Sequence, residues 1–576
     1  SNKSANQNNK KNTNRRSKQG QQKRSSKATL RIIPLGGLDA IGKNMTVFEC
    51  KDDMVLDDAG LMFPDDDHPG IDLILPDYTY VLENADKLRG IIITHGHEDH
   101  TGALPYLLKD LGRQVPIYAT KLTLGLIEGK LKEHKIQNAK LCEIKPGQTI
   151  DLGCIKAEFF SVNHSIPDAV GVFCRSPAGN VLHTGDFKLD QSPIDGVQTD
   201  FAALARFSKE GVDLMLSDST NAMNPSFTPS EAEVGKALDS IISGAKGRVI
   251  VASFASHIHR MQQICDAAVK NGRKVAVTGR SMVQNTDIAR RLGYLNISDK
   301  DIIDAYDLKG MPPDSYVVMC TGSQGEPLSA LARIASGNHK TISIEEGDTV
   351  IISATPVPGN EKAVTRVVNA LAKIGADVYD KSRACVHVSG HAGAEELKLV
   401  LSIVRPDAFL PVHGEATHLR AHANLAQATG VTRENIYILE NGESIELTPN
   451  GIKIGEPVAS GIVLVDGLSV GDTSEMVLHE RSSLGAQGVA SIACAVSKQK
   501  RTLASSVVVE MHGIPGGDDP ELVKAVSNAV ASAIKRSLSK EESWNETRKV
   551  ARSALLSVLW ERTNQRPLVI VNILEL

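Results

Sequence analysis

A run of six residues, HGHEDH beginning at His95, constrains this chain more than any other stretch. It follows the apolar segment 90–94, so the sequence predicts a buried strand that ends in a loop of metal-binding side chains. His95 and His97 are two residues apart, and side chains at this spacing point to one side of an extended chain. Asp99 and His100 follow where we expect a helix to begin, so one loop can serve two adjacent metals.

Three more candidate ligands occur farther along the chain. His164, Asp186 and His413 each follow a short apolar, strand-like run. A dinuclear site needs several ligands, including a bridging carboxylate, and ligands at successive strand ends collect at one rim of a sandwich. The sequence therefore predicts a two-metal centre. Its imidazole and carboxylate ligands suit zinc or manganese better than calcium.

The chain resembles the metallo-β-lactamase superfamily and, within it, the β-CASP nucleases of the ribonuclease J family. The resemblance extends from about residue 30 to the C-terminus. It is carried by PLGG at 34–37, DDAGLMFP at 57–64, HGHEDHTG at 95–102, HTGD at 183–186, SDSTN at 217–221, TGSQGE at 321–326, HVSGH at 387–391 and PVHGE at 411–415.

The resemblance implies an α/β fold with a metallo-β-lactamase αββα sandwich, an inserted parallel α/β domain (the β-CASP domain) and a small C-terminal α/β domain. The pattern agrees, since helices such as 230–245 alternate with strands such as 274–278, as parallel sheets require. The expected parts are a disordered basic tail (1–27), the sandwich (28–229 and 386–455), the β-CASP domain (230–385), a linker (456–480) and a C-terminal domain for dimerisation (481–576).

The resemblance also implies a role for each candidate ligand. His95, His97 and His164 are expected to hold one metal, Asp99, His100 and His413 the other, and Asp186 to bridge the two, so that water attacks the scissile phosphate. Asp58 and Asp218 resemble acidic residues that orient ligands or water. His387 and His391 resemble residues that contact the phosphate and protonate the leaving oxygen. The expected catalytic set is Asp99, Asp186, Asp218, His387 and His391.

Two loops are expected to hold substrate phosphates. The segment 387–391 follows a predicted strand and precedes a helix expected near Ala394, so a serine hydroxyl, a glycine amide and a helix N-terminus form an anion cradle. The segment 254–257 likewise lies between a strand, 248–252, and a helix. The expected phosphate contacts are Ser256, His257, His387, Ser389, Gly390 and His391.

Three further residues resemble the oxygen ligands of a structural calcium or manganese ion: Gly70, Asp72 and Asp466. From the sequence alone they are loop residues, and a solvated loop is the open alternative.

Composition limits the classes of protein to which this chain can belong. A chain of 576 residues with 41% hydrophobic residues should contain two to four domains. With 4% aromatic residues, base stacking is not expected as the main mode of nucleic-acid binding. The eight cysteines show no C-x-x-C pair, which favours a reducing cytoplasm. No apolar run reaches the ~18 residues of a membrane span.

The first 27 residues hold nine Lys or Arg and no acid, on a chain with net charge −4. Such a tail cannot bury a core, so we predict disorder. A cationic tail suits loose attachment to RNA or the ribosome, and a solubilising tail without a specific partner is the open alternative.

The resemblance implies hydrolysis of single-stranded RNA, 5′→3′ from 5′-monophosphate ends and also internally, in rRNA processing and mRNA decay. It further implies a homodimer or homotetramer and an RNA-degradation assembly. Four alternatives stay open: a glyoxalase II-like hydrolase of small esters or thioesters, a DNA-directed β-CASP nuclease, a redox diiron protein and a catalytically inactive RNA-binding scaffold. The α/β insert argues against the first of these, and His413 against the second. The lack of an evident flavin domain argues against the third, and the complete ligand set against the fourth.

Overall fold

The computed structural model describes residues 28–65, 67–326, 328–357, 360–497 and 499–576. The predicted basic tail, 1–27, lies outside the described residues. The chain divides into two compact units. One contains the described residues up to Met62 together with Leu75–Ile462, and the other contains Phe63–Ile74 and Val463–Leu576. Each unit is described by itself.

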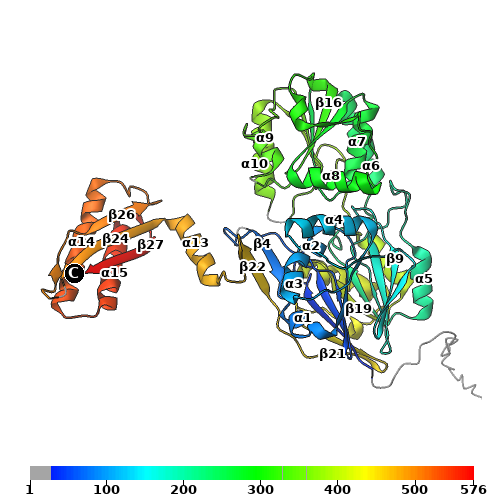
Figure 1. The fold of residues 1–576 in the computed structure, drawn as a ribbon, viewed down its shortest axis with the longest axis horizontal. Helices are drawn as coiled ribbons and strands as arrows, with labels where there is room; N and C mark the ends of the chain where they lie inside the picture. The colour runs from blue at the N-terminus through cyan, green and yellow to red at the C-terminus, as the bar shows by residue number, and fades with distance from the viewer. Residues whose placement is uncertain (1–27, 66, 327, 358–359, 498) are drawn as a thin grey trace, which may run out of the picture. The chain divides into compact units, whose positions relative to one another are not determined.

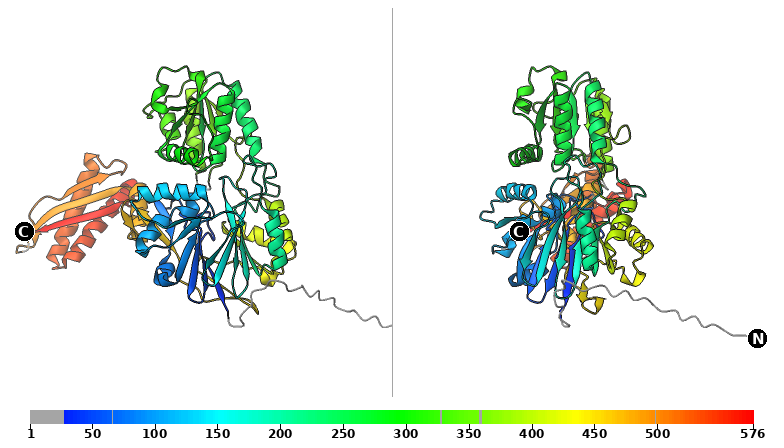
Figure 2. Two further views of the ribbon diagram at one scale, coloured as in Figure 1. Left: turned by 45° about the vertical axis from the view of Figure 1, so that its right-hand side comes forward. Right: turned by 90° about the vertical axis from the view of Figure 1, so that its right-hand side faces the viewer.

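The first unit contains a sandwich of two sheets between outer helices (Figures 1 and 2). One sheet has the order β21 (Gly451–Ile454), β20 (Ile445–Thr448), β1 (Leu30–Gly36), β2 (Met45–Cys50), β3 (Asp53–Asp57), β5 (Leu88–Ile92), β6 (Ile117–Ala119) and β7 (Leu141–Glu143). The other has the order β19 (Ala408–Val412), β12 (Leu214–Asp218), β11 (Asn180–His183), β10 (Val170–Arg175), β9 (Ile155–Ser161) and β8 (Thr149–Leu152). The helices are α1 (Thr79–Glu83), α2 (Glu98–Thr101), α3 (Leu104–Leu111), α4 (Lys121–Glu133), α5 (Phe201–Glu210), α11 (Ala394–Val404) and α12 (Ala416–Ala428).

The sandwich is held together by apolar side chains that both sheets turn inward. Phe48 and Val55 from the first sheet share one buried cluster with Phe159, Val172 and Leu410 from the second. Burying such residues removes apolar area from water, which stabilises the folded state by roughly 25 cal/mol for each Å² buried. The packed interior fixes the strand ends, from which the loops of the candidate metal centre extend.

The inserted domain is a parallel sheet with helices on both faces (Figure 1). Its order is β15 (Ile302–Asp304), β14 (Lys274–Thr278), β16 (Tyr316–Cys320), β13 (Val249–Ala252), β17 (Thr349–Ile352) and β18 (Asp377–Tyr379), and these pairings are all parallel. The crossover helices are α6 (Glu231–Gly244), α7 (Ile258–Lys270), α8 (Arg280–Leu292), α9 (Ala330–Ala335) and α10 (Glu361–Ile374). The predicted αββα sandwich with an inserted parallel α/β layer is confirmed.

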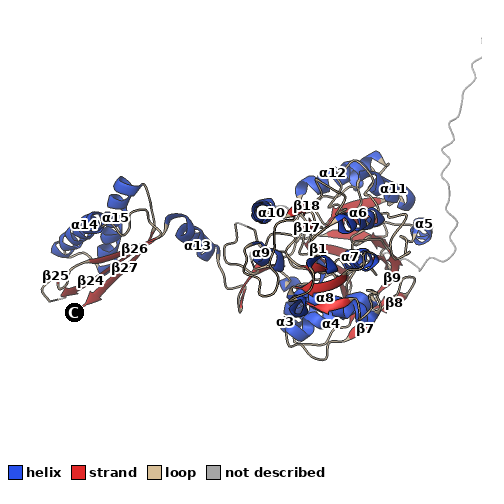
Figure 3. Cartoon of the chain, turned by 90° about the horizontal axis from the view of Figure 1, so that it is seen from above, coloured by secondary structure: helices blue, strands red, loops and turns tan. Residues whose placement is uncertain are grey.

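The second unit ends in a small α/β sheet, as predicted. The strands β24 (Val489–Ser497), β25 (Thr502–Leu503), β26 (Val508–His512) and β27 (Leu568–Glu575) carry the helices α14 (Pro520–Ser539) and α15 (Trp544–Thr563) on one side (Figure 3). The helix α13 (Glu475–Gln487) precedes this sheet. A separate three-stranded sheet has the order β23 (Ser469–Val470), β22 (Ile462–Asp466) and β4 (Leu73–Pro76).

Two local predictions differ from the structure. The segment directly before His387 forms no strand, because the carbonyl of Val386 accepts hydrogen bonds from the side chains of Arg260 and Ser353 rather than from a neighbouring strand. The predicted linker 456–480 contains β22 and β23, since its Gly, Ser and Asp residues flank the apolar run that forms β22.

Candidate metal centre

The HGHEDH loop begins where β5, a strand paired on both sides, ends at Ile92. His95 is fully buried, and His97 is the N-cap residue of the short helix α2, which begins close to where the sequence predicted a helix. Because Asp99 and His100 lie in this helix, the chain turns between the two pairs of candidate ligands. The loop therefore supplies side chains to two neighbouring groups.

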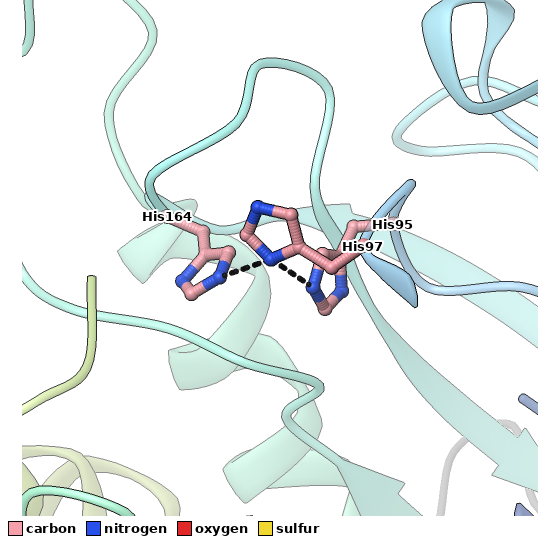
Figure 4. A group of neighbouring side chains, drawn as sticks. All are labelled: His95, His97 and His164. Atoms are coloured by element: carbon pink, nitrogen blue, oxygen red, sulfur yellow. Dashed lines mark hydrogen bonds between the residues drawn. The ribbon is translucent and has the colours of Figure 1, made fainter. Parts of the chain in front are cut away.

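The first group consists of three imidazoles, those of His95, His97 and His164. The Nδ1 atom of His97 lies 3.0 Å from His95 Nε2 and 3.1 Å from His164 Nε2 (Figure 4). Burial lowers the pKa of His95 and His164 well below the usual value, and that of His97 to about 4. These rings are neutral at pH 7, the form in which imidazole binds a metal.

The second group contains two carboxylates and two imidazoles: Asp99, His100, Asp186 and His413. The Nε2 atoms of His100 and His413 lie 3.2 and 3.3 Å from Asp186 Oδ2. They lie 3.5 and 3.7 Å from Asp99 Oδ2. Although burial opposes charge on His100, Asp186 and Asp58 raise its pKa well above the usual value.

Asp186 lies between the two groups. The same oxygen, Oδ2, is 3.8 Å from the Nε2 atoms of both His95 and His164, in addition to its contacts in the second group. Burial alone would raise the pKa of Asp186, but His100 and His413 hold it well below the usual value. A buried, ionised carboxylate in this position suits the bridging role expected from the sequence.

The environment of His413 fits a metal ligand. Both of its ring nitrogens are buried, and the structure gives neither a hydrogen-bond partner within the described ranges. Buried polar atoms without partners are uncommon, and a bound metal ion would give such an atom its partner. His413 also has a φ of 54°, a left-handed conformation that is costly outside glycine and recurs at functional sites. The nitrogen and oxygen donors of both groups fit zinc or manganese.

The carboxylate of Asp58 contacts the second group. It accepts hydrogen bonds from His100 Nδ1 at 2.6 Å and from the backbone N–H of Thr94 at 2.8 Å. The contact leaves Nε2 of His100 directed to Asp186. Nearby, a Cβ on Gly60 would lie 1.6 Å from the carbonyl oxygen of Asp99, so only glycine allows this close approach.

A further pair beside the second group joins Asp218 to His391. Nδ1 of His391 lies 2.8 Å from Asp218 Oδ2 and 3.9 Å from Asp186. Burial disfavours the charged ring, but Asp218 and Asp186 outweigh it and raise the pKa of His391 to about 9. Asp218 is fixed at the end of β12 by the N–H of Thr220 at 3.0 Å.

The segment 387–391 connects this pair to the first group. Gly390 O accepts a hydrogen bond from His164 Nδ1 at 2.8 Å, and Ser389 Oγ accepts one from the His391 N–H at 3.1 Å. Burial lowers the pKa of His387 to about 3, and the positive charge of Arg260 acts in the same direction. His387 is therefore neutral and His391 charged at pH 7.

The second expected phosphate loop ends at the N-terminus of α7. His257 is the N-cap residue of this helix, and its Nδ1 accepts the Arg260 N–H at 3.3 Å. Ser256 precedes it, in the turn that follows β13. Contact with a phosphate stays a prediction for all six expected residues: Ser256, His257, His387, Ser389, Gly390 and His391.

The predicted structural cation site is not among the His, Cys, Asp and Glu clusters of metal-binding geometry that the described residues form. Asp466 accepts a hydrogen bond from Arg481 at 2.5 Å, and Asp72 accepts one from the Gly467 N–H at 2.8 Å. Gly70 lies beside the same arginine. This site stays a prediction.

One buried pair was not identified from the sequence. His183 Nδ1 lies 2.6 Å from Asp57 Oδ2, at the facing ends of β11 and β3. Each is the first residue of a recognised motif, DDAG or HTGD, and the last residue of its strand, so the rule that ligands occur at strand ends could have drawn attention to them. Among the helices that the structure describes, none is long and apolar enough to cross a membrane.

Comparison with known proteins agrees with this geometry. Four family profiles match the chain: "Ribonuclease J, beta-CASP domain" at 246–371, "Ribonuclease J C-terminal domain" at 476–576, "Beta-lactamase superfamily domain" at 68–240 and "Zn-dependent metallo-hydrolase RNA specificity domain" at 376–439.

Relatives extend along nearly the whole chain. Ribonuclease J of Mycolicibacterium smegmatis is 43% identical over 549 residues, 95% of this chain and 97% of that protein. Ribonuclease J of Thermus thermophilus is 46% identical over 465 residues, 80% of this chain and 81% of that protein. A solved structure of a protein of unknown function from Enterococcus faecalis is 17% identical, covers 73% of this chain and 100% of its own, and has a TM-score of 0.51, which supports the fold alone. The chain belongs to the ribonuclease J family.

Proposed function

We propose that the chain is a metal-dependent ribonuclease that hydrolyses RNA phosphodiesters, both 5′→3′ from 5′-monophosphate ends and internally, in RNA maturation and mRNA decay. One observation carries the proposal: Asp186 Oδ2 lies within 3.9 Å of a nitrogen from each of five histidines, which come from four separate segments of the chain. Those five are His95, His100, His164, His391 and His413.

The donor sets support two divalent metals, zinc or manganese. We propose that His95, His97 and His164 hold one, that Asp99, His100 and His413 hold the other, and that Asp186 contacts both. When bound, the metals supply positive charge at the phosphate and lower the pKa of water. Asp58 holds the His100 ring so that Nε2 points to this centre.

The protein's own proton carrier is proposed to be His391. Since its Nδ1 is held by Asp218, the Nε2 atom is the one that can deliver a proton to the leaving oxygen. His387 is neutral and can donate only a neutral N–H to a phosphate oxygen. Ser389 and Gly390, with Ser256 and His257 of the facing loop, are proposed to bind the terminal phosphate.

Further parts of the proposal rest on the family. The substrate is single-stranded RNA, and the protein acts in the cytoplasm as a homodimer or homotetramer through residues 481–576, within an RNA-degradation assembly or on the ribosome. The sandwich is proposed to comprise 28–229 and 386–455, the β-CASP domain 230–385 and the linker 456–480. A structural calcium or manganese ion is proposed at Gly70, Asp72 and Asp466.

The test compares one RNA sequence bearing a 5′-monophosphate, a 5′-triphosphate or a 5′-hydroxyl, with a DNA oligomer of the same sequence as a fourth substrate. We expect the monophosphate RNA to be degraded fastest and DNA to be left intact. Ser389→Ala should reduce the monophosphate preference more than internal cutting, whereas Ser243→Ala, on the outer helix α6, should change neither. Equal degradation of RNA and DNA, or equal loss of both activities in Ser389→Ala, would contradict the proposal.

A further inference from the structure

Arg260 is a completely buried cation in α7 that the reaction described above does not use. Its side chain is 0% exposed. Removing a guanidinium from water is costly unless a carboxylate and further acceptors satisfy its N–H groups. Glu231, at the start of α6, supplies the carboxylate: Oε1 lies 2.8 Å from Nε and 2.6 Å from Nη2 of the arginine.

The remaining contacts of the guanidinium lead to the segment 387–391. Nη1 of Arg260 donates to the carbonyl of Val386 at 2.8 Å and to the carbonyl of Ser353 at 3.2 Å, and it also contacts the Ser353 hydroxyl. That hydroxyl donates to the same Val386 carbonyl at 2.7 Å. Val386 is the residue directly before His387, and it is fully buried. Two side chains therefore fix the backbone at the entrance to the segment.

The same arginine also borders the second phosphate loop. Nη2 lies 3.5 Å from His257 Nε2, while the backbone N–H of Arg260 donates to His257 Nδ1 at 3.3 Å. Both ring nitrogens of His257 thus face one residue. The side chain of Arg260 occupies the space between the two loops that the proposed function assigns to the terminal phosphate.

We propose that Arg260 is a positioning residue: its guanidinium fixes the entrance of the segment 387–391 next to the His257 ring and so sets the preference for a 5′-phosphate. This inference rests on the proposed terminal-phosphate function of those loops. Lysine has one rotatable ammonium group rather than a planar fork of five donors, so it cannot reach Glu231, Val386 and Ser353 together.

A second buried arginine provides a matched control. Arg248 precedes β13 and contacts Asp348 at 3.0 Å and Tyr316 at 2.8 Å. It lies at the opposite end of the same parallel sheet, separated from the Ser353 end by a four-residue strand, which is roughly 13 Å. Arg248→Lys therefore disturbs a comparable buried pair in the same domain without touching either phosphate loop.

The experiment measures two quantities in the full-length protein, Arg260→Lys and Arg248→Lys. One is the ratio of kcat/KM for 5′-monophosphate RNA to kcat/KM for 5′-hydroxyl RNA, and the other is amide hydrogen exchange in peptides covering 385–391. In Arg260→Lys we expect the ratio to fall by about tenfold or more, since small displacements of positioned groups have large effects, and exchange in 385–391 to accelerate. Arg248→Lys should leave both unchanged.

Equal exchange over 385–391 in the two variants would overturn the inference. If the parent protein does not distinguish the two RNAs, the proposed terminal-phosphate function fails, and the exchange comparison still decides whether Arg260 fixes the segment. Ser353→Ala is the milder second variant in case Arg260→Lys does not fold. This variant removes one hydroxyl, so exchange over 385–391 should accelerate and the kcat/KM ratio should fall about threefold. Unchanged exchange in Ser353→Ala would equally overturn the inference.

Discussion

The two groups of the metal centre differ in charge. The first, His95, His97 and His164, consists of imidazoles whose pKa values are lowered by burial, so the group is neutral. The second combines two carboxylates with His100, whose pKa is raised by Asp186 and Asp58 against the effect of burial. A cation in the first position depends on Asp186 for nearby negative charge, whereas the second position also has Asp99.

The surroundings of the two groups differ as well. His164, in the first group, donates from Nδ1 to the carbonyl of Gly390, in the proposed phosphate segment. His100, in the second, is held by the buried carboxylate of Asp58 and lies 3.1 Å from Asn44. The first group is therefore hydrogen-bonded to the substrate loop, whereas the loop approaches the second only through His391, 3.9 Å from the shared Asp186. Substrate-loop variants should affect the first position more than the second.

Asp186→Ala should have the largest effect, because Asp186 contacts both groups. We expect RNA hydrolysis to fall by at least ~100-fold and the content of both metals to decrease. Turnover assays and elemental analysis of the dialysed protein provide the measurement. Asp151→Ala, at an exposed acid of β8 paired with Lys156, is the control and should retain both properties. Full metal content in Asp186→Ala would mean that Asp186 does not join the two positions.

His97→Ala should affect only one position. The variant is expected to lose about one metal equivalent and about 100-fold in activity, since it removes one ligand of the first group but leaves Asp186 and the second group in place. The same elemental analysis decides between one and two metals. His134→Ala, which removes a partly exposed ring beside Tyr106, is the matched control. Loss of both metals in His97→Ala would contradict the separation of the centre into two groups.

Much of this centre was predictable because its ligands follow a local rule. Each of His164, Asp186 and His413 comes shortly after the end of an apolar strand, and one short motif supplies the remaining ligands. The alternation of helices and strands likewise predicted the parallel insert, with β14 at the expected residues. These features depend on residues close together in the chain.

The parts that were missed depend on distant residues. The sequence around Val386 alternates apolar and polar residues as a strand does, but its carbonyl is satisfied by two side chains, those of Arg260 and Ser353. Arg260 and its partner Glu231 are 29 positions apart, and neither belongs to a recognisable motif. A single arginine in a helix normally indicates a solvated face, so only the tertiary structure reveals that this one is buried.

Asp58→Asn should have an intermediate effect confined to the second group. Asparagine keeps the shape of the side chain but removes the negative charge beside His100 Nδ1, so the ring is a weaker and less well-oriented ligand. We expect about a tenfold loss of metal affinity at one position and none at the other, measured by metal titration. Asp53→Asn, at the start of β3, the strand that directly precedes Asp58, is the control. An equal loss of metal affinity at both positions would show that Asp58 does not act on the second group alone.

Glu49 sharpens the comparison, because the pKa of this carboxylate is lowered by a lysine, an arginine and a tyrosine rather than by ligand histidines. It lies on β2 and accepts hydrogen bonds from Tyr80 at 2.6 Å, Lys87 at 2.7 Å and Arg31 at 3.3 Å. Burial raises the pKa of Glu49, but its hydrogen bonds to Lys87 and Tyr80 and the charges of Lys87 and Arg31 outweigh this and lower it. Its contribution to stability is therefore present above the unfolded-state pKa and lost as the pH falls through the folded-state pKa.

Glu49→Gln should reduce the free energy of unfolding at pH 7 by about 1–2 kcal/mol, because charge-assisted hydrogen bonds are replaced by neutral ones. Thermal unfolding followed from pH 7 downward should show the difference between variant and parent shrinking as the pH falls through the folded-state pKa of Glu49. Metal content and activity should not change at pH 7, in contrast to the variants of Asp186 and Asp58. A difference in the free energy of unfolding that stays constant across the pH range would show that the charge of Glu49 does not stabilise this part of the sandwich. Loss of metal in Glu49→Gln would show that Glu49 helps to hold one of the two groups.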